Sequence, residues 1–223
     1  MKEIGPNQYY QNPVFIVGMP RSGTTLIQGI LCNTGFYFPI PETHFFSRVG
    51  FGLPESLNEE NREKIFRALL EKSRIEVDEQ ALLKLNFKKE VFEYVIGIFN
   101  TENKSTFLEK TPRHVFFYSK ILEYYPSAKF ICMIREPKNV VSSQLTNTRI
   151  EHKSIIRAAF LYNKIADGIL DIKSKSNVFL VKYEELTHEP ESILKKVFKF
   201  LEIPYSSKFA DKVAAPPEIV SAH

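Results

Sequence analysis

The residues between 13 and 34, which read PVFIVGMPRSGTTLIQGILCNT, combine three features that together could bind an anion. An apolar run at 14–17 predicts a strand, and the apolar residues between 26 and 31 share one face of a predicted helix. Gly18 and Gly23 bound the turn between them and allow a tight backbone path. Amides at a helix N-terminus point outward, and the helix dipole favours negative charge there. The stretch therefore predicts a phosphate-binding turn.

One position distinguishes this turn from loops that bind nucleoside triphosphates. The P-loop signature is G-x-x-x-x-G-K-[ST]. Gly18, Gly23 and Thr25 fit it, but Thr24 occupies the lysine position. That lysine reaches the β- and γ-phosphates, so its absence argues against ATP or GTP. Arg21 lies inside the loop and could supply a cation, which predicts a site for a single 5′-phosphate. The alternative is an ordinary strand–helix turn with chance glycines.

A second cationic pattern follows another apolar run, at residues 129–134. Arg135 comes directly after this predicted strand, and Ser143 lies eight residues later on a predicted helix. A forked guanidinium and a hydroxyl can share one phosphate. A triphosphatase would usually place a magnesium-binding aspartate after such a strand. The alternative is a surface ion pair between Arg135 and Glu136.

The two patterns together resemble a known family. The run PRSGTT at 20–25 resembles the 5′-phosphosulfate loop of sulfotransferases that use 3′-phosphoadenosine 5′-phosphosulfate (PAPS). The spacing of Arg135 and Ser143 resembles the 3′-phosphate motif of the same family. The resemblance covers residues 13–204 and implies a PAPS-dependent sulfotransferase of the bacterial and tyrosylprotein branch. It implies transfer of a sulfuryl group to an acceptor hydroxyl without a metal, and no Cys/His cluster has metal-ligand spacing.

The resemblance also implies a catalytic base. In tyrosylprotein sulfotransferases a Glu-Thr pair at the same distance from the loop arginine supplies it, which here selects Glu42. A carboxylate can take the acceptor proton if burial raises its pKa. Two alternatives remain: His44 has the better intrinsic pKa, and Glu42 could cap a helix that starts near Thr43. Cytosolic sulfotransferases carry a histidine directly after a Lys-Thr pair, but here Pro112 stands there and His114 is displaced by two, which favours the glutamate.

Lys110 and Tyr183 follow two further predicted strands. The resemblance implies that Lys110 stabilises the charge on the oxygen bridging sulfur and phosphorus, and that Tyr183 contacts the nucleotide. The alternatives are an exposed lysine and a half-buried aromatic at strand ends. The implied catalytic residues are Arg21, Glu42 and Lys110. The implied nucleotide-binding residues are Arg21, Ser22, Gly23, Thr24, Thr25, Arg135, Ser143 and Tyr183.

The elements that must position these residues alternate between strand and helix. Apolar runs predict strands at 14–17, 106–108, 129–134 and 178–181, with a further short strand at 36–40. Such alternation predicts a parallel sheet with right-handed crossovers, and ligands bind beyond the carboxyl ends of its strands. We therefore expect a three-layer P-loop-type α/β fold, with about four to five parallel strands and helices on both faces. The whole chain, 1–223, is expected to be one domain.

Residues 54–104 differ from the rest in their dense charges and helical periodicity. They predict a helical insertion, including a short helix capped by Asp78. We expect this insertion to cover the acceptor side of the site; simple packing on the sheet is the alternative. Residues 154–173 predict a long amphipathic helix, and Pro190 begins another. The last twenty residues show no clear element.

Composition limits the class of protein. A net charge of +4, a pI near 8.9 and a hydrophobic fraction of 43% fit a mildly basic globular enzyme rather than a nucleic-acid-binding protein. Cys32 and Cys132 read as small buried hydrophobes. No apolar run is as long as a membrane span, and the first residues have no apolar signal-peptide core. If the 223 residues are the whole chain, we expect a soluble cytoplasmic protein.

Two other functions stay open at this point. A P-loop kinase for a small metabolite would need the loop lysine and a magnesium-binding aspartate, and a non-catalytic nucleotide-binding module would need neither. For a sulfotransferase the acceptor could be a small molecule, a glycan, a lipid or a peptide hydroxyl, and a homodimer is one candidate assembly. The Arg-Lys-Gly segment that closes over the nucleotide in cytosolic relatives does not occur in this sequence.

Overall fold

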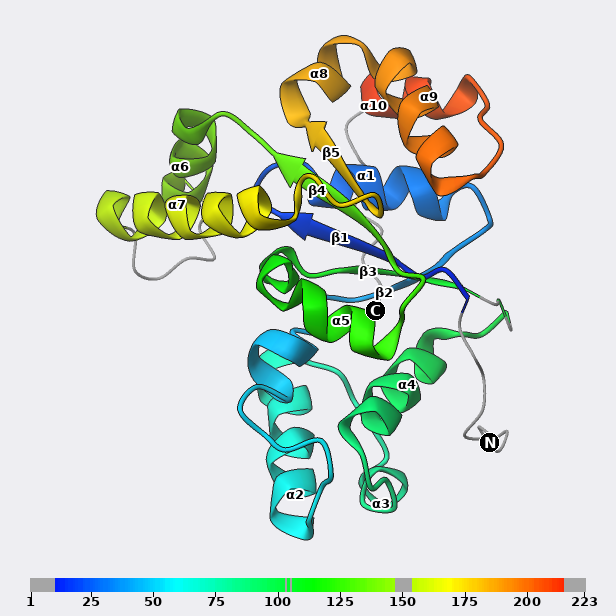
Figure 1. Cartoon of the computed structure of the whole chain (residues 1–223), viewed down its shortest axis with the longest axis vertical. Coiled ribbons are helices and arrows are strands. Elements are labelled where there is room, and N and C mark those ends of the chain that lie inside the picture. The colour runs from blue at the N-terminus through cyan, green and yellow to red at the C-terminus, as the bar shows by residue number, and fades with distance from the viewer. Residues whose placement is uncertain (1–10, 103, 105, 147–153, 215–223) are drawn as a thin grey trace.

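A computed structural model describes residues 11–102, 104, 106–146 and 154–214 (Figure 1). Its centre is one sheet of five parallel strands in the order β2-β3-β1-β4-β5, which confirms the predicted parallel α/β fold. The strands are β1 (Val14–Gly18), β2 (Phe38–Ile40), β3 (Phe107–Lys110), β4 (Lys129–Ile134) and β5 (Val178–Lys182). β3 extends two residues beyond the predicted apolar run, because Glu109 and Lys110 are buried and continue the strand.

Helices cover one face of the sheet with a compact apolar layer. They are α1 (Thr24–Cys32), α8 (Tyr183–His188), α9 (Pro190–Leu201) and α10 (Lys208–Ala214); Figure 1 shows α8, α9 and α10 at the top, with α1 below them. Val14 and Ile16 of β1 pack with this layer. α9 begins at Pro190 as predicted, since proline fits the first turn of a helix.

The opposite face carries the larger part of the core. Its elements are η1 (Phe45–Val49), α2 (Glu59–Ala68), η2 (Leu69–Ser73), α3 (Glu79–Leu82), α4 (Lys88–Phe99), η3 (Pro112–Phe117), α5 (Tyr118–Tyr124) and α7 (Ile155–Ile172). Phe15 of β1 lies here, with its ring 5.6 Å from that of Phe130 and 5.7 Å from that of Phe107. Every residue of β1 is buried, as expected for a central parallel strand covered on both faces.

The segment 54–104 is helical, as predicted. Asp78 caps α3, because its side chain accepts hydrogen bonds from the amides of Gln80 and Ala81 at 2.9 and 3.2 Å. Apolar residues of α2, η2 and α4 belong to the same core as the sheet: Ile65, Leu69, Val91, Phe92, Val95 and Ile96. That the segment also covers an acceptor stays a prediction.

Two elements differ from the predictions. The last twenty residues were expected to lack structure, but residues 208–214 form α10; residues 215–223 lie outside the described part of the chain. Phe209 is the buried residue of α10, with its ring 5.3 Å from that of Phe198 on α9, and Ala210 and Val213 pack on the same apolar layer. The sequence predicts that the helix with Ser143 begins at Asn139, but α6 (Pro137–Thr146) begins two residues earlier, at Pro137. None of the helices in the described ranges is both long and apolar enough to span a membrane.

Candidate active site

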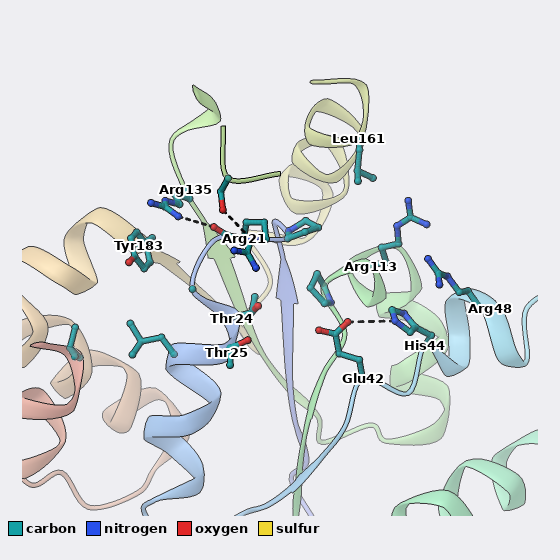
Figure 2. A pocket seen from close by; sticks show the side chains of 16 residues that line it. Arg21, Thr24, Thr25, Glu42, His44, Arg48, Arg113, Arg135, Leu161 and Tyr183 are labelled. Carbon is teal, nitrogen blue, oxygen red and sulfur yellow. Dashed lines mark hydrogen bonds and ion pairs between the residues drawn. The ribbon is translucent and has the colours of Figure 1, made fainter. Parts of the chain in front are cut away.

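A cavity of about 780 Å³ opens at the carboxyl ends of the strands (Figure 2). Of the site residues that the sequence predicts, all but Ser22 and Lys110 line it. Its wall is formed by Pro20, Arg21, Gly23, Thr24, Thr25, Leu26, Glu42, His44, Arg48, Pro112, Arg113, Arg135, Ser143, Leu161, Tyr183 and Val213. Among these described residues four are arginines and Glu42 is the one carboxylate, so the cavity favours anions.

The loop between β1 and α1 has a backbone that few residues could adopt. Gly18, Arg21 and Gly23 have φ angles of 120°, 69° and 87°. A Cβ at Gly18 would lie 2.2 Å from the carbonyl oxygen of Met133, so this position requires glycine. The buried Ser22 hydroxyl donates to the carbonyl of Met19, which braces the loop from inside and explains why Ser22 does not line the cavity.

The amides of residues 21–25 make no hydrogen bond within the described part of the chain. They lie at the N-terminal end of α1, a nine-residue helix. Free amides at such an end are suited to a phosphate group. The predicted anion loop is therefore present as a preformed cradle.

The second cationic pattern meets the first in space. Arg21 Nε donates to Ser143 Oγ at 3.0 Å, and Arg135 Nη1 donates to the carbonyl of Arg21 at 3.1 Å. Glu136 pairs with Lys138 at 3.1 Å instead of with Arg135. Arg135 Nε is buried and has no hydrogen-bond partner among the described residues. A buried donor without a partner is costly, which makes Arg135 a candidate ligand for an anion.

Tyr183 begins α8 and forms the floor beneath Arg135. The Arg135 guanidinium lies 4.3 Å from the centre of its ring, a cation–π distance. The Tyr183 ring also leaves no room for a side chain at position 23 of the loop, because a Cβ at Gly23 would lie 2.5 Å from Tyr183 Cδ2. Gly23, Arg135 and Tyr183 thus form one packed unit, built from the segments that follow β1, β4 and β5.

Glu42 lies on the other side of the cavity, next to His44 (Figure 2). Its carboxylate forms an ion pair with Lys110 Nζ, and its other oxygen lies 3.5 Å from His44 Nε2. Lys110 is 9% exposed and is therefore not a surface lysine. Glu42 does not cap the following helix, since η1 begins at Phe45 with His44 as its N-cap residue. The candidate base and the candidate cation are in direct contact.

His44 has an unusual backbone and an unusual environment. Its φ of 50° is left-handed, so the segment is neither extended nor helical at this point. Burial lowers the pKa of His44, partly opposed by the Glu42 carboxylate, and its Nδ1 has no hydrogen-bond partner among the described residues. The imidazole is thus favoured in its neutral form. The sequence expectation that only one of the two reaches an acceptor stays a prediction.

The structure adds two residues that the sequence did not single out. Arg48 of η1 and Arg113 of η3 line the cavity beside Glu42, and neither side chain has an ion pair or hydrogen bond with any other described residue. Burial and the charge of Arg48 lower the pKa of Arg113. Nothing in the sequence distinguishes these arginines from surface ones, because their meeting depends on the fold.

No group of three or more His, Cys, Asp or Glu side chains in the described ranges could hold a metal ion. The two cysteines lie outside the cavity wall, and burial raises the pKa of each thiol to about 12.

The structure is that of an α/β protein with a loop of free amides after its central strand. Comparison with known families gives the class: residues 13–207 match the family model described as the sulfotransferase family. This match covers most of the sequence. The chain belongs to the sulfotransferase family.

Relatives and solved structures agree with that assignment. The protein-tyrosine sulfotransferase of Drosophila melanogaster is 25% identical over 203 residues, which is 86% of this chain and 38% of that protein. The sulfotransferase domain of the Synechococcus PCC 7002 olefin synthase has the same fold, with a TM-score of 0.63 at 21% identity over 95% of this chain and 81% of that one.

A second structure, a sulfotransferase from Alicyclobacillus acidocaldarius, has a TM-score of 0.59 at 20% identity over 94% of this chain and 87% of that one. The chain spans about a quarter to about half the length of the curated relatives it matches, from 26% to 54%.

Proposed function

We propose that this chain transfers a sulfuryl group from PAPS to the hydroxyl of an acceptor. Membership of the sulfotransferase family supports transfer chemistry. One observation carries the proposal: a single cavity is lined by the anion loop and Arg135 at one end and by Glu42, paired with Lys110, at the other. The first end suits a nucleotide with two separate phosphates. The second suits proton removal from an acceptor.

The residues present fit the two phosphates of PAPS. The free amides of residues 21–25 and the Arg21 side chain suit the 5′-phosphosulfate. Arg135, with its unpartnered buried Nε, and Ser143 suit the 3′-phosphate, since guanidinium and hydroxyl donors form charge-assisted hydrogen bonds with phosphate oxygens. Tyr183 would bound the same side of the nucleotide.

The roles of the remaining residues follow from the chemistry. When bound, PAPS supplies the sulfuryl group at the end of its 5′-phosphate. Glu42 accepts the proton of the acceptor hydroxyl. Lys110 donates to the oxygen on which negative charge develops, an interaction that strengthens only as the bond breaks. Arg21 and the loop amides hold the departing phosphate.

The acceptor must reach Glu42, and Arg48 and Arg113 line the same cavity. A small molecule, a glycan, a lipid and a peptide can each present a hydroxyl there. The two unpaired arginines favour an acceptor with a negative group near that hydroxyl.

Calorimetry with 3′,5′-adenosine bisphosphate and 5′-AMP tests the nucleotide site. The bisphosphate should bind at least about tenfold more tightly, because each charge-assisted contact contributes over 1 kcal/mol. Equal affinities would remove the 3′-phosphate site from the proposal.

Turnover with labelled PAPS over a panel of acceptors tests the reaction itself. Tight bisphosphate binding without transfer to any acceptor would favour the non-catalytic module. ATP binding that depends on magnesium would favour the kinase.

A further inference from the structure

Glu109 is a fully buried carboxylate that the proposed chemistry does not use. It lies on β3 directly before Lys110, and its register partners are Phe15 of β1 and Ile40 of β2. Side chains alternate across a strand, so Glu109 shares the face of Phe107, which belongs to the apolar core. A charged residue inside a sheet at this point needs a physical reason.

Four donors surround this carboxylate. The hydroxyl and the amide of Thr43 donate to its Oε1 at 3.1 and 3.4 Å, and the Thr111 hydroxyl donates to the same oxygen. His114 Nδ1 lies 3.0 Å from its Oε2. Although burial alone raises the pKa of Glu109, the nearby His114 and these hydrogen bonds outweigh it and lower the pKa. The group is thus held as a carboxylate.

Two of these donors, Thr43 and Thr111, are chain neighbours of the proposed catalytic residues. Thr43 lies between Glu42 and His44, and Thr111 follows Lys110 directly. The amide of His44 also donates to the Thr111 hydroxyl at 3.4 Å. One buried carboxylate therefore joins the chain segment that carries the candidate base to the segment that carries the candidate cation.

Strand pairing in the sheet does not join these two segments. β2 ends at Ile40, so residues 42–44 have no strand ladder to fix them against the end of β3. The Glu109 side chain takes the place of that ladder. A buried ion pair or hydrogen-bonded charge is seldom needed for stability, because apolar residues of similar size often stabilise as well. A role in positioning the segments of Glu42 and Lys110 therefore explains the buried Glu109 carboxylate, whereas stability does not.

We propose that Glu109 is a positioning residue, which holds Glu42 and Lys110 in register through Thr43 and Thr111. The inference rests on the proposed function, because it assigns a purpose to the contact between the base and the cation. Glu109 itself is 0% exposed, whereas Lys110 is 9% exposed, and Glu109 is not expected to touch either substrate. Its effect should therefore fall on the rate of the chemical step, not on nucleotide binding.

The first experiment uses Glu109→Gln. We expect kcat to fall about tenfold to a hundredfold, the scale for a misplacement of about 1 Å, with little change in the acceptor KM. Affinity for 3′,5′-adenosine bisphosphate should stay within about twofold to threefold, since the loop lies on β1 and α1. Glu55→Gln is the matched control: this carboxylate binds Tyr124, Lys88 and Lys120 away from the cavity. An unchanged kcat in a folded Glu109→Gln protein would overturn the proposal.

A second pair of variants covers the case in which Glu109→Gln does not fold. Thr43→Val removes the hydroxyl but keeps the shape, whereas Thr43→Ser keeps the hydroxyl. Positioning through this hydrogen bond predicts that valine lowers kcat and that serine recovers most of the loss. Equal kcat values for the two variants would contradict it.

A double variant tests whether Glu109 acts through the base. If it does, Glu109→Gln should cost much less in a Glu42→Gln protein than in the native one, because coupled residues are non-additive. The same fold loss in both backgrounds would show that Glu109 acts independently and would overturn the proposal.

Hydrogen exchange separates this inference from the proposed function, because it needs no turnover. In Glu109→Gln, amides at 42–46 and 110–114 should exchange at least about tenfold faster, while those at 18–25 should not. If exchange rises there but the native chain transfers no sulfuryl group, the positioning holds and the proposed reaction fails. If the native chain is active and exchange is unchanged, the positioning fails alone.

Discussion

Glu42 and His44 both line the cavity, and Glu42 Oε2 lies 3.5 Å from His44 Nε2. The choice of base therefore lies between two neighbouring side chains. Lys110 contacts Glu42 and not His44. Because burial lowers the pKa of His44, the neutral form of the imidazole is favoured, and this form can accept a proton. The pairing with Lys110 is what favours Glu42.

Glu42→Gln should lower kcat by about two to four orders of magnitude, the usual scale for loss of a general base. His44→Ala should lower it less, mainly through lost packing. Both variants should be measured with one acceptor from about pH 5 to 9, so that a change in protonation is not mistaken for loss of the base. An inactive His44→Ala enzyme beside an active Glu42→Gln enzyme would assign the base to the histidine.

Lys110→Ala should lower kcat about a hundredfold or more, because one transition-state donor is lost. Affinity for 3′,5′-adenosine bisphosphate should change little. Lys182→Ala is a suitable control, since that lysine also ends a strand but is exposed and pairs with Glu185. Equal kcat values for both alanine variants would leave Lys110 without a catalytic role.

At this scale the sequence predicted residues that belong to local motifs. Arg21, Arg135 and Ser143 were found because each stands at a recognisable distance from a strand or a glycine. Glu109 was passed over, although a glutamate directly after an apolar run could have signalled it. Its partner Thr43 lies 66 residues away, and Arg48 and Arg113 meet only in the folded chain. Contacts across such distances leave no local pattern.

The strand–loop–helix element of β1 and α1 depends on the two loop glycines, and Gly23 offers the cleaner test. Gly23→Ala should weaken bisphosphate binding by at least about tenfold, because φ is 87° and the new methyl would meet Tyr183 at 2.5 Å. Gly29→Ala on α1 is the control: nothing lies within 4 Å of its Cβ position, so it should stabilise the helix by about 0.5–1 kcal/mol. Comparable affinities in the two variants would contradict a loop held by Tyr183.

The elements η1 and η3 present Arg48 and Arg113 to the acceptor side, which predicts a charge preference. Arg48→Ala and Arg113→Ala should raise the KM of anionic acceptors several-fold while leaving that of neutral acceptors nearly unchanged. The difference should shrink as salt rises, since ions screen exposed charges. Kinetics with paired anionic and neutral acceptors at two ionic strengths measure this. An equal effect on both acceptors would indicate lost packing instead.

Elements were predicted from the sequence where a periodic pattern or a cap was present. Asp78 before α3 and Pro190 at the start of α9 mark helix starts by local chemistry. α10 was missed because one aromatic, Phe209, ties it to α9, and β2 could only be named as a short extended segment. Such elements exist through tertiary contact.

At the scale of the whole molecule, β1 lies at the centre of the parallel sheet, between β3 and β4. The residues proposed to bind the nucleotide lie in the loop after β1, at the start of α1, directly after β4, and on α6 and α8. Ligand binding should therefore stabilise the whole sheet and not one loop.

Thermal unfolding checks this point. At a concentration of 100 times its Kd, 3′,5′-adenosine bisphosphate should add about 2.7 kcal/mol to the free energy of unfolding and raise Tm. The same concentration of 5′-AMP should shift Tm much less. Arg135→Ala should reduce the shift caused by the bisphosphate towards that caused by 5′-AMP. Matching shifts for both nucleotides in the native chain would show that the 3′-phosphate contributes nothing.

The strand order also places two groups of proposed site residues in different parts of the chain. Glu42, Arg48, Lys110 and Arg113 all precede residue 118, on the side of β2 and β3. Arg135, Ser143 and Tyr183 all follow residue 128, on the side of β4 and β5. With the proposed roles, a lineage can exchange one hydroxyl compound for another by changing residues 42–48 and 110–113, while the loop at 18–25 and the second half of the chain go on binding the same donor. Glu109 should stay unchanged during such an exchange, because any new acceptor side must still keep Glu42 in register with Lys110.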